Sequence, residues 1–272
     1  MNKTLLFISS CLSSLLLFSC ATPSENHIEA AREMGLQDVV VNSGQFHHRI
    51  YLNKHVQQQV DHSVIHVYLD GDGTPWESRR WITDDPSPRT YLVLRMMMQD
   101  QVSAILLGRP CYLGFSLSTA CHHKYWTSHR YSHQIVSSMT KVLNSWIQSK
   151  HYKKVVLIGY SGGGTLAMLM APAIKSVDTV LTVAANLDIV AWSQLHGYSP
   201  LFGSLNPAEF SLPEDIKQIH LSGEDDKVVP TNIVKQISKK NSQARFFSFT
   251  NYNHHCCWDD SWFSLLTRIL KE

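Results

Sequence analysis

A serine between closely spaced glycines is the strongest chemical signal in this 272-residue chain. A run of aliphatic residues leads directly into the segment Gly159-Tyr160-Ser161-Gly162-Gly163, and a helical pattern follows it. In a sharp strand-to-helix turn of this kind the serine side chain stands above a sheet, and glycines are needed where backbones approach closely. The amino end of the helix directs N–H groups toward developing negative charge. The pattern predicts that Ser161 is a nucleophile, and an idle serine in a glycine-rich turn is the alternative.

Two polar loops further along the chain carry a candidate acid and a candidate base. The first contains the adjacent Asp225 and Asp226, and the second contains the adjacent His254 and His255. Together with the motif around Ser161, these loops resemble the α/β-hydrolase superfamily, in which nucleophile, acid and histidine occur in that chain order. The resemblance places the acid at Asp226, with Asp225 as the alternative. It places the base at His254, with His255 as the alternative.

The resemblance also implies where the oxyanion of a tetrahedral intermediate would be bound. One donor would be the backbone N–H of Gly162, directly after the nucleophile. The second would come from the loop that follows the predicted strand 64–69, where we expect the N–H of Asp72, with Gly71 next. Asp70 stands where many of these hydrolases have histidine, so its carboxylate must point away from the oxyanion.

Three loop patches resemble a branch of bacterial envelope α/β-hydrolases, namely residues 71–73, 109–132 and 256–258. All three are expected at the carboxyl ends of strands, around the site. Aromatic side chains would line a shallow substrate cleft there, and packing of the loops is the alternative for the tryptophans. The residues expected to line it are Trp76, Tyr160, Trp126 and Trp258.

The amino terminus has the layout of a secretory signal, with one positive charge followed by a short apolar stretch. The stretch ends just before Cys20 and resembles a bacterial lipobox, which implies cleavage before this cysteine and its acylation. Because Ala21 follows, the resemblance implies sorting to the outer membrane, facing the periplasm; secretion without a lipid is the alternative. We therefore expect a signal peptide at 1–19, a lipidated cysteine and tether with a short surface helix at 20–36, and a hydrolase domain at 37–272.

Export to an oxidising compartment favours disulfides over catalytic thiols. Four cysteines would remain beside Cys20 in the mature chain, and four allow three pairings. Pairing of Cys111 with Cys121 is favoured, which leaves Cys256 with Cys257, while crossed pairing between the two loops stays open. The cysteines and histidines lack the spacing of a zinc site, and we expect no metal.

Short β-branched runs alternate with helical patterns after about residue 60, which predicts a mostly parallel sheet flanked by helices. The expected strands are 64–69, 102–107, 154–158, 179–183, 216–221 and 245–249, with an antiparallel edge pair at 39–41 and 48–52. The expected helices are 90–99, 132–150, 163–170, 232–239 and 258–270. Together with the motifs, these elements predict an α/β-hydrolase fold. Its cap should be small, formed by residues 187–196 and the loop 197–207.

The composition fits one globular domain, with 44% hydrophobic residues, 17% charged residues and a net charge of +2. No basic block supports nucleic-acid binding. The expected function is carboxylesterase-like hydrolysis of a small-molecule or lipid-like ester or thioester, without a cofactor, by a protein held at the membrane through its acyl anchor. A serine peptidase or amidase, an acyl transferase, and a non-catalytic envelope binding protein on the same scaffold are the alternatives.

Overall fold

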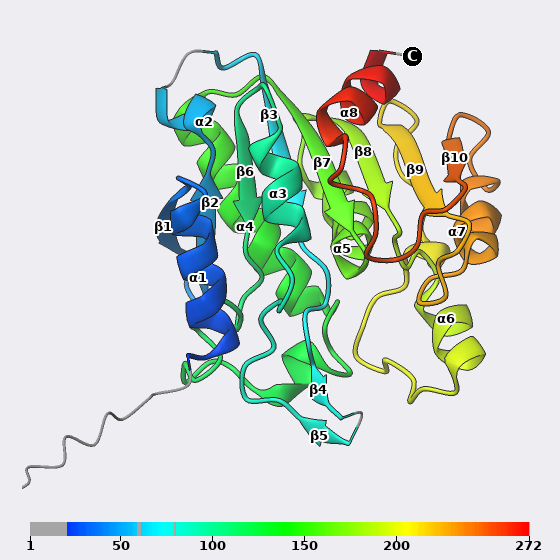
Figure 1. Cartoon of the computed structure of the whole chain (residues 1–272), viewed down its shortest axis with the longest axis horizontal. Coiled ribbons are helices and arrows are strands. Elements are labelled where there is room, and N and C mark those ends of the chain that lie inside the picture. The colour runs from blue at the N-terminus through cyan, green and yellow to red at the C-terminus, as the bar shows by residue number, and fades with distance from the viewer. Residues whose placement is uncertain (1–20, 59–60, 79, 272) are drawn as a thin grey trace, which may run out of the picture.

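Eight strands form one central sheet in the computed structural model, which describes residues 21–58, 61–78 and 80–271 (Figure 1). In spatial order the strands are β1 (Gln37–Asn42), β2 (His47–Leu52), β6 (Ala104–Leu107), β3 (Val64–Leu69), β7 (Lys154–Tyr160), β8 (Val177–Val183), β9 (Lys217–Gly223) and β10 (Arg245–Phe249). Strand β2 is antiparallel to both of its neighbours, and the other neighbouring pairs from β6 to β10 are parallel. The mostly parallel sheet and the antiparallel edge pair are as predicted.

Helices cover both faces of this sheet. Helices α3 (Leu92–Met98) and α8 (Trp262–Lys271) lie in front of it in Figure 1, whereas α4 (His133–Lys150) lies behind it and packs against α5 (Gly162–Met170). The remaining helices are α1 (Pro23–Glu33), α2 (Lys54–Gln58), α6 (Ile189–His196) and α7 (Thr231–Ser238). The carboxyl ends of the parallel strands point toward the lower edge of Figure 1, where α6 and the hairpin of β4 (Trp76–Glu77) and β5 (Trp81–Ile82) lie.

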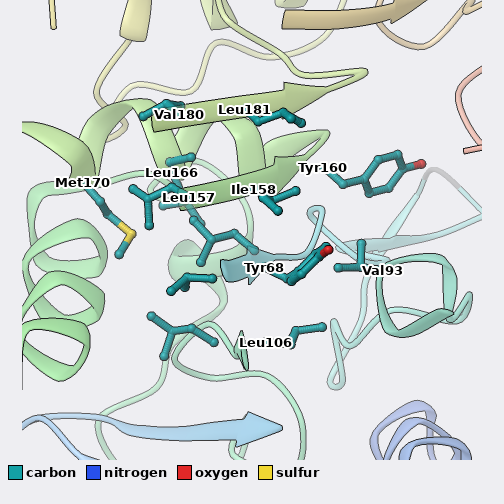
Figure 2. Close-up of a cluster of buried hydrophobic side chains, with 14 of the residues drawn as sticks. Tyr68, Val93, Leu106, Leu157, Ile158, Tyr160, Leu166, Met170, Val180 and Leu181 are labelled. Atoms are coloured by element: carbon teal, nitrogen blue, oxygen red, sulfur yellow. The ribbon is translucent and has the colours of Figure 1, made fainter. Parts of the chain in front are cut away.

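The core lies on both sides of the central strands. Leu157 and Ile158 of β7 are buried on opposite faces, next to Leu181 of β8 (Figure 2). A strand that is covered on both faces has a continuous run of apolar residues rather than an alternating pattern. This is why β7 could be predicted from its sequence. On the α3 side the core includes a polar network, because Asp100 accepts hydrogen bonds from Tyr68 at 2.7 Å and His66 at 2.6 Å. Trp262 of α8 donates in turn to the Tyr68 hydroxyl at 2.8 Å.

The observed elements differ from the expected ones mainly at their ends. Helix α8 begins at Trp262 rather than at 258, because the side chain of Trp258 is buried in the preceding loop and donates to the carbonyl of Asn253. Helix α3 begins at Leu92 rather than at residue 90. The short α2 and the β4–β5 hairpin were not predicted, since two to five residues are too few for a hydrophobic period to be read.

The amino-terminal helix is part of the folded body. Thr22 caps α1 with a capping box, and Ser24 and His27 on one face of the helix are buried. A surface helix is present in the segment expected as a tether, but from Pro23 onward this segment is docked on the domain. The predicted signal peptide at 1–19 and Cys20 lie outside the described residues. Within residues 21–58, 61–78 and 80–271, no helix is both long and apolar enough to cross a bilayer.

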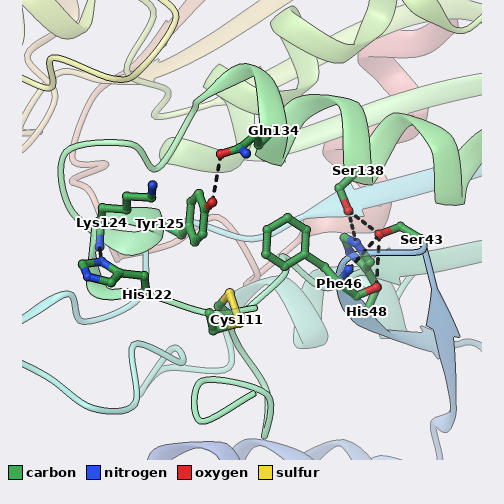
Figure 3. The surroundings of a disulfide bond; sticks show 10 residues. Ser43, Phe46, His48, Cys111, His122, Lys124, Tyr125, Gln134 and Ser138 are labelled. Carbon is green, nitrogen blue, oxygen red and sulfur yellow. Dashed lines mark hydrogen bonds between the residues drawn. A yellow bond between two sulfur atoms is a disulfide. The ribbon is translucent and has the colours of Figure 1, made fainter. Parts of the chain in front are cut away.

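Two disulfides are formed, Cys111–Cys121 and Cys256–Cys257. The first disulfide joins two cysteines that are ten residues apart in the loop between β6 and α4, and Figure 3 shows its surroundings. In the same region Tyr125 donates to Gln134 of α4 at 2.8 Å, and its ring packs edge-on against Phe46. The favoured pairing is therefore found, and crossed pairing is not. This disulfide constrains the loop between β6 and α4, which contributes residues to the candidate active site.

Candidate active site

Ser161 lies on the tight turn between β7 and α5, at the carboxyl edge of the sheet. Its backbone has φ 51° and ψ −122°, a conformation that costs a non-glycine residue energy and that persists only where its surroundings impose it. A Cβ atom on Gly159 would lie 2.3 Å from the carbonyl oxygen of Gly163, and one on Gly163 would lie 2.0 Å from that of Leu69. Both glycines of the motif are thus required by close backbone contact, as the sequence predicted.

A continuous line of hydrogen bonds joins Ser161 to His254 and Asp226. His254 Nε2 lies 3.1 Å from Ser161 Oγ, and His254 Nδ1 lies 2.8 Å from Asp226 Oδ2. Asp226 is buried, and its other oxygen accepts the N–H groups of Val228 and Val229, both at 2.8 Å. His254 is only 6% exposed. The three residues come from the turns after β7, β9 and β10, which meet at one edge of the sheet.

The alternative acid and base lie outside this line. Asp225 is exposed, and its N–H donates to the carbonyl of Tyr252. His255 Nδ1 lies 3.2 Å from the hydroxyl of Tyr160 rather than next to the serine. Partial burial and the neighbouring His254 lower the pKa of His255. Of the two histidines the structure brings only His254 to Ser161, and of the two aspartates only Asp226 to His254.

Tyr160 holds the loop that carries His254 through both its hydroxyl and its ring. Its hydroxyl donates to the backbone carbonyl of His254 at 2.8 Å, and its ring is 5.3 Å from the His254 ring. Burial, with the charges of Asp70 and Asp226 adding to it, raises the pKa of Tyr160, so the phenol remains a hydrogen-bond donor. With only 6% of its surface exposed, Tyr160 holds the histidine loop rather than lining the open cleft that was expected.

The loop after β3 places its two aspartates in different directions. Asp70 Oδ1 accepts the N–H of Gly71 at 2.7 Å, and Asp70 Oδ2 faces the buried His27 of α1 at 3.9 Å. The N–H of Gly71 is therefore occupied, so Gly71 is wrong as a candidate oxyanion donor. No hydrogen bond within the described part of the chain engages the N–H of Asp72 or that of Gly162.

The Asp72 side chain is held in a cluster that sequence reasoning did not find. Its carboxylate accepts hydrogen bonds from Arg109 Nη1 at 2.6 Å, Arg130 Nη1 at 2.9 Å and the Tyr131 hydroxyl at 2.6 Å. Both arginines lie in the loop between β6 and α4, within the patch 109–132 that was expected around the site, but neither arginine was given a role there. The sequence offered one signal for this cluster, namely two arginines near aromatic residues. Nothing local in the sequence indicates that these arginines contact Asp72.

The expected aromatic cleft differs from the observed surface. Trp126 is 1% exposed and donates to the carbonyl of Thr83, and Trp258 is fully buried. These two tryptophans pack the loops, so the prediction that they line the cleft is wrong. Trp76 in β4 is 43% exposed and remains available to a ligand. The cap region is small as expected and consists of α6 with the loop that follows, where Tyr198 and Phe202 are exposed.

Among the described residues, no group of three or more histidine, cysteine, aspartate or glutamate side chains is placed to hold a metal ion. The reacting groups available at this edge of the sheet are thus a serine, an imidazole and a carboxylate in hydrogen-bond contact. Beside them stand two unoccupied backbone N–H groups. This set is suited to nucleophilic attack on a carbonyl carbon and proton transfer to a leaving group.

The chain is similar to known hydrolases in sequence and in fold. Residues 116–261 match the dienelactone hydrolase family. No curated protein matches the chain. Among solved structures, Est1E from Butyrivibrio proteoclasticus is 9% identical, with a TM-score of 0.56 over 86% of this chain and 99% of that one. An esterase from Pyrococcus furiosus is 12% identical, with a TM-score of 0.62 over 88% and 92%.

A serine hydrolase described as lacking a lid, from Xanthomonas campestris, is also similar. It is 9% identical, with a TM-score of 0.54 over 87% of this chain and 92% of that one. At such identities the likeness to these structures establishes the fold alone. The predicted α/β-hydrolase fold is confirmed.

Proposed function

The chain belongs to the dienelactone hydrolase family and is a hydrolase, and from this premise we propose that it is a lipid-anchored serine hydrolase of carboxylic esters or thioesters. The observation that carries the proposal is the hydrogen-bonded line from Ser161 through His254 to Asp226. A non-catalytic binding protein has no need to keep all three groups in contact beside a strained serine. The complete line therefore favours an enzyme over a binding protein.

In the proposed reaction Ser161 Oγ attacks the carbonyl carbon of the ester while His254 Nε2 accepts the serine proton. The 3.1 Å separation of these atoms is within the reach of a proton transfer. Asp226 accepts the Nδ1–H of the ring, which holds the tautomer whose Nε2 is free to act as a base, and it stabilises the imidazolium that forms. His254 then donates the proton to the departing alcohol or thiol.

The tetrahedral intermediate places a negative charge on the former carbonyl oxygen. We assign its donors to the backbone N–H of Gly162, at the amino end of α5, and to the N–H of Asp72. Collapse of this intermediate leaves the acyl group on Ser161. Water, activated by His254, then attacks the acyl-enzyme and releases the acid. Displacement by an acceptor hydroxyl or amine in place of water would make the same protein an acyl transferase.

The anchoring part of the proposal rests on the sequence before Pro23. Acylation at Cys20 would put the lipid only two residues before the capping box that starts α1. The domain would then lie close against the outer membrane, on its periplasmic side, and would meet small-molecule or lipid-like esters there. The two disulfides fit this oxidising compartment.

Labelling by a fluorophosphonate probe tests the nucleophile directly. We expect the purified mature domain to be labelled and its Ser161→Ala variant to remain unlabelled. On p-nitrophenyl esters, Ser161→Ala should lower kcat on the order of 10⁶-fold, because the members of such a triad act as a unit. An unlabelled, folded wild-type protein would contradict the proposal and favour a binding protein.

A substrate panel decides between the enzyme classes that share this mechanism. We expect p-nitrophenyl esters and acyl thioesters to be cleaved, and aminoacyl p-nitroanilides of the same acyl size to show no turnover above the Ser161→Ala background. Turnover of the anilides above that background would make the protein a peptidase or amidase. Product analysis with an added alcohol acceptor separates hydrolysis from acyl transfer. Metabolic labelling of the full-length chain with an alkyne fatty acid, beside Cys20→Ser, tests the anchor.

A further inference from the structure

A buried carboxylate with two guanidinium groups lies directly behind the nucleophile turn, and the reaction proposed above gives it no role. Arg109 and Arg130 are only 3% and 7% exposed, and both donate to the carboxylate of Asp72. Tyr131 donates a third hydrogen bond to it at 2.6 Å. Burying charged groups is costly unless they are paired in good geometry, so such a cluster requires an explanation.

The cluster carries a net charge of +1, from two arginines and one aspartate. Burial alone would raise the pKa of Asp72, but the charges of Arg130 and Arg109, together with the hydrogen bonds from Tyr131 and Arg109, hold it well below its usual range. Burial disfavours the charged form of Arg109, but its neighbours Tyr112 and Asp72 keep the pKa of Arg109 above its usual range. The carboxylate and the guanidinium groups therefore stay ionised, and the two cations offset the negative charge of Asp72.

The cluster contacts both of the residues whose N–H groups are the proposed oxyanion donors. A Cβ atom on Gly162 would lie 2.2 Å from Asp72 Oδ1 and 2.5 Å from the Tyr131 hydroxyl, so the side chain of Asp72 rests against the first turn of α5. The backbone of Asp72 is also held on the far side of its Cα, because the Tyr112 hydroxyl donates to the Asp72 carbonyl at 3.0 Å.

The arginines tie this arrangement to the surrounding loops. Arg109 Nη1 donates to the carbonyl of Gly71 at 3.2 Å, and Arg109 Nη2 donates to that of Arg130 at 2.8 Å. Arg130 Nε donates to the carbonyl of Thr127 at 2.8 Å. The loop after β3 and the loop between β6 and α4 are thereby joined at the carboxylate of Asp72. None of these hydrogen bonds uses the N–H of Asp72.

We propose that Asp72, Arg109, Arg130 and Tyr131 are positioning residues, which fix the N–H groups of Asp72 and Gly162 where the oxyanion forms. The inference rests on the proposed function, since it concerns the same intermediate. Preorganised donors of this kind stabilise the transition state more than the bound substrate. Loosening the cluster should therefore lower kcat and leave KM nearly unchanged.

The decisive variant is Tyr131→Phe, which removes one hydroxyl from the cluster and leaves all charges in place. Its matched control is Tyr125→Phe, because Tyr125 is also buried in the same loop and donates to Gln134, away from Asp72. We expect Tyr131→Phe to lower kcat about 10-fold on a p-nitrophenyl ester, with KM within about twofold. Tyr125→Phe should leave both constants within about twofold.

Inhibition by a trifluoromethyl ketone distinguishes a role in oxyanion binding from a merely structural role, which would leave this inhibition unchanged. Serine adds to this ketone and forms an oxyanion, so a change of its inhibition constant between variants with the same triad reports the oxyanion donors. We expect Tyr131→Phe to weaken inhibition by about the same factor as it lowers kcat/KM, in a protein that is fully folded at the assay temperature. Unaltered ketone inhibition, or equal losses of kcat in Tyr131→Phe and Tyr125→Phe, would overturn the inference.

Asp72→Asn provides a second, stronger perturbation. The amide keeps the shape but leaves two buried cations opposite a neutral group, and we expect kcat to fall by about 10²-fold or more. A loss of thermal stability in this variant is expected as well, which is why Tyr131→Phe is the decisive comparison. A wild-type enzyme that turns over esters, with both variants equally active, would overturn this inference alone. An inactive, unlabelled wild type would instead overturn the proposed function.

Discussion

At the scale of single residues, the two adjacent histidines give the clearest test of the site. His254→Ala removes the imidazole that lies between Ser161 and Asp226, and we expect kcat/KM for an ester to fall about 10³-fold or more. His255→Ala removes a ring that packs edge-on against His254 and contacts the Tyr160 hydroxyl but takes no part in the Ser161–His254–Asp226 line, and we expect a loss of less than about fivefold. Parallel kinetics of the two variants make the comparison.

Equal losses in the two histidine variants would contradict the assignment of His254 as the base. Adjacent positions make this a well-matched pair, because both variants change the same residue type in the same loop. The unfolding midpoint of each variant provides the control for folding, and fluorophosphonate labelling then reports the reactivity of Ser161. A folded His254→Ala protein should still present Ser161 but should react with the probe far more slowly than His255→Ala.

The reacting residues were predictable from the sequence, whereas the cluster behind them was not. Ser161 is marked by glycines that the turn requires within two residues of it, and this signal is local. Asp226 and His254 follow β9 and β10, and both strands were predicted from their apolar runs. The contacts of Asp72 reach Arg109 and Arg130 across 37 and 58 positions. A contact over such a separation leaves no periodicity or spacing in a single sequence.

At the scale of elements, the sheet was predicted better than the segments around it. Strands β3 and β10 match their expected bounds of 64–69 and 245–249, because a strand buried on both faces, or ended by turn residues, gives a strong pattern. The docking of α1 was not predicted, since its buried face is made of small and polar residues such as Ser24 and His27 rather than an apolar stripe.

Helix α1 is anchored by polar contacts to the loops behind the active site. The Ser24 N–H donates to Asp85 at 2.8 Å, and Ser24 Oγ accepts the N–H of Gly114 at 2.9 Å. His27 lies fully buried between Tyr51, at 3.4 Å, and Asp70. Since Asp70 also accepts the Gly71 N–H, the helix next to the proposed lipid anchor contributes to the order of the oxyanion loop.

We therefore expect His27→Ala to destabilise the fold by about 1–3 kcal/mol, because it leaves a cavity at a fully buried position and removes the contact with the Tyr51 hydroxyl. For a domain of this size the unfolding midpoint should fall by about 3–10 °C. Asn26→Ala is the matched control on the same helix, since Asn26 is exposed and its loss should change stability by less than about 0.5 kcal/mol. Equal midpoints for the two variants would show that the buried His27 side chain does not contribute to stability.

At the scale of the whole molecule, the sheet order explains how distant segments form one site. Parallel strands end at the same edge, so the turns after β3, β7, β9 and β10 converge there although they span residues 70–254 of the chain. The cap consists of α6 and the loop that follows it, which lie at this edge of the sheet (Figure 1). The exposed side chains of Tyr198 and Phe202 lie in that loop.

Two buried histidines away from the site link the stability of the fold to pH. Burial lowers the pKa of His48 to about 4 and that of His220 to about 4, from an ordinary value of 6.5. His48 lies 3.0 Å from the carbonyl of Gly108. On its other side it lies 2.7 Å from the hydroxyl of Ser138 (Figure 3). His220 lies in β9, 2.8 Å from the hydroxyl of Thr182. Both rings are held neutral in the folded protein.

Because the folded-state pKa values lie below 6.5, the unfolded chain binds more protons than the folded one between pH 4 and 6.5. The free energy of unfolding should therefore be constant above about pH 7 and fall as the pH drops through this window, by up to about 1.4 kcal/mol per pH unit for each histidine. Urea unfolding at pH 7 and pH 5 measures the difference. His220→Asn cannot titrate there and should shrink it, so an undiminished pH dependence in this variant would remove His220 as a cause.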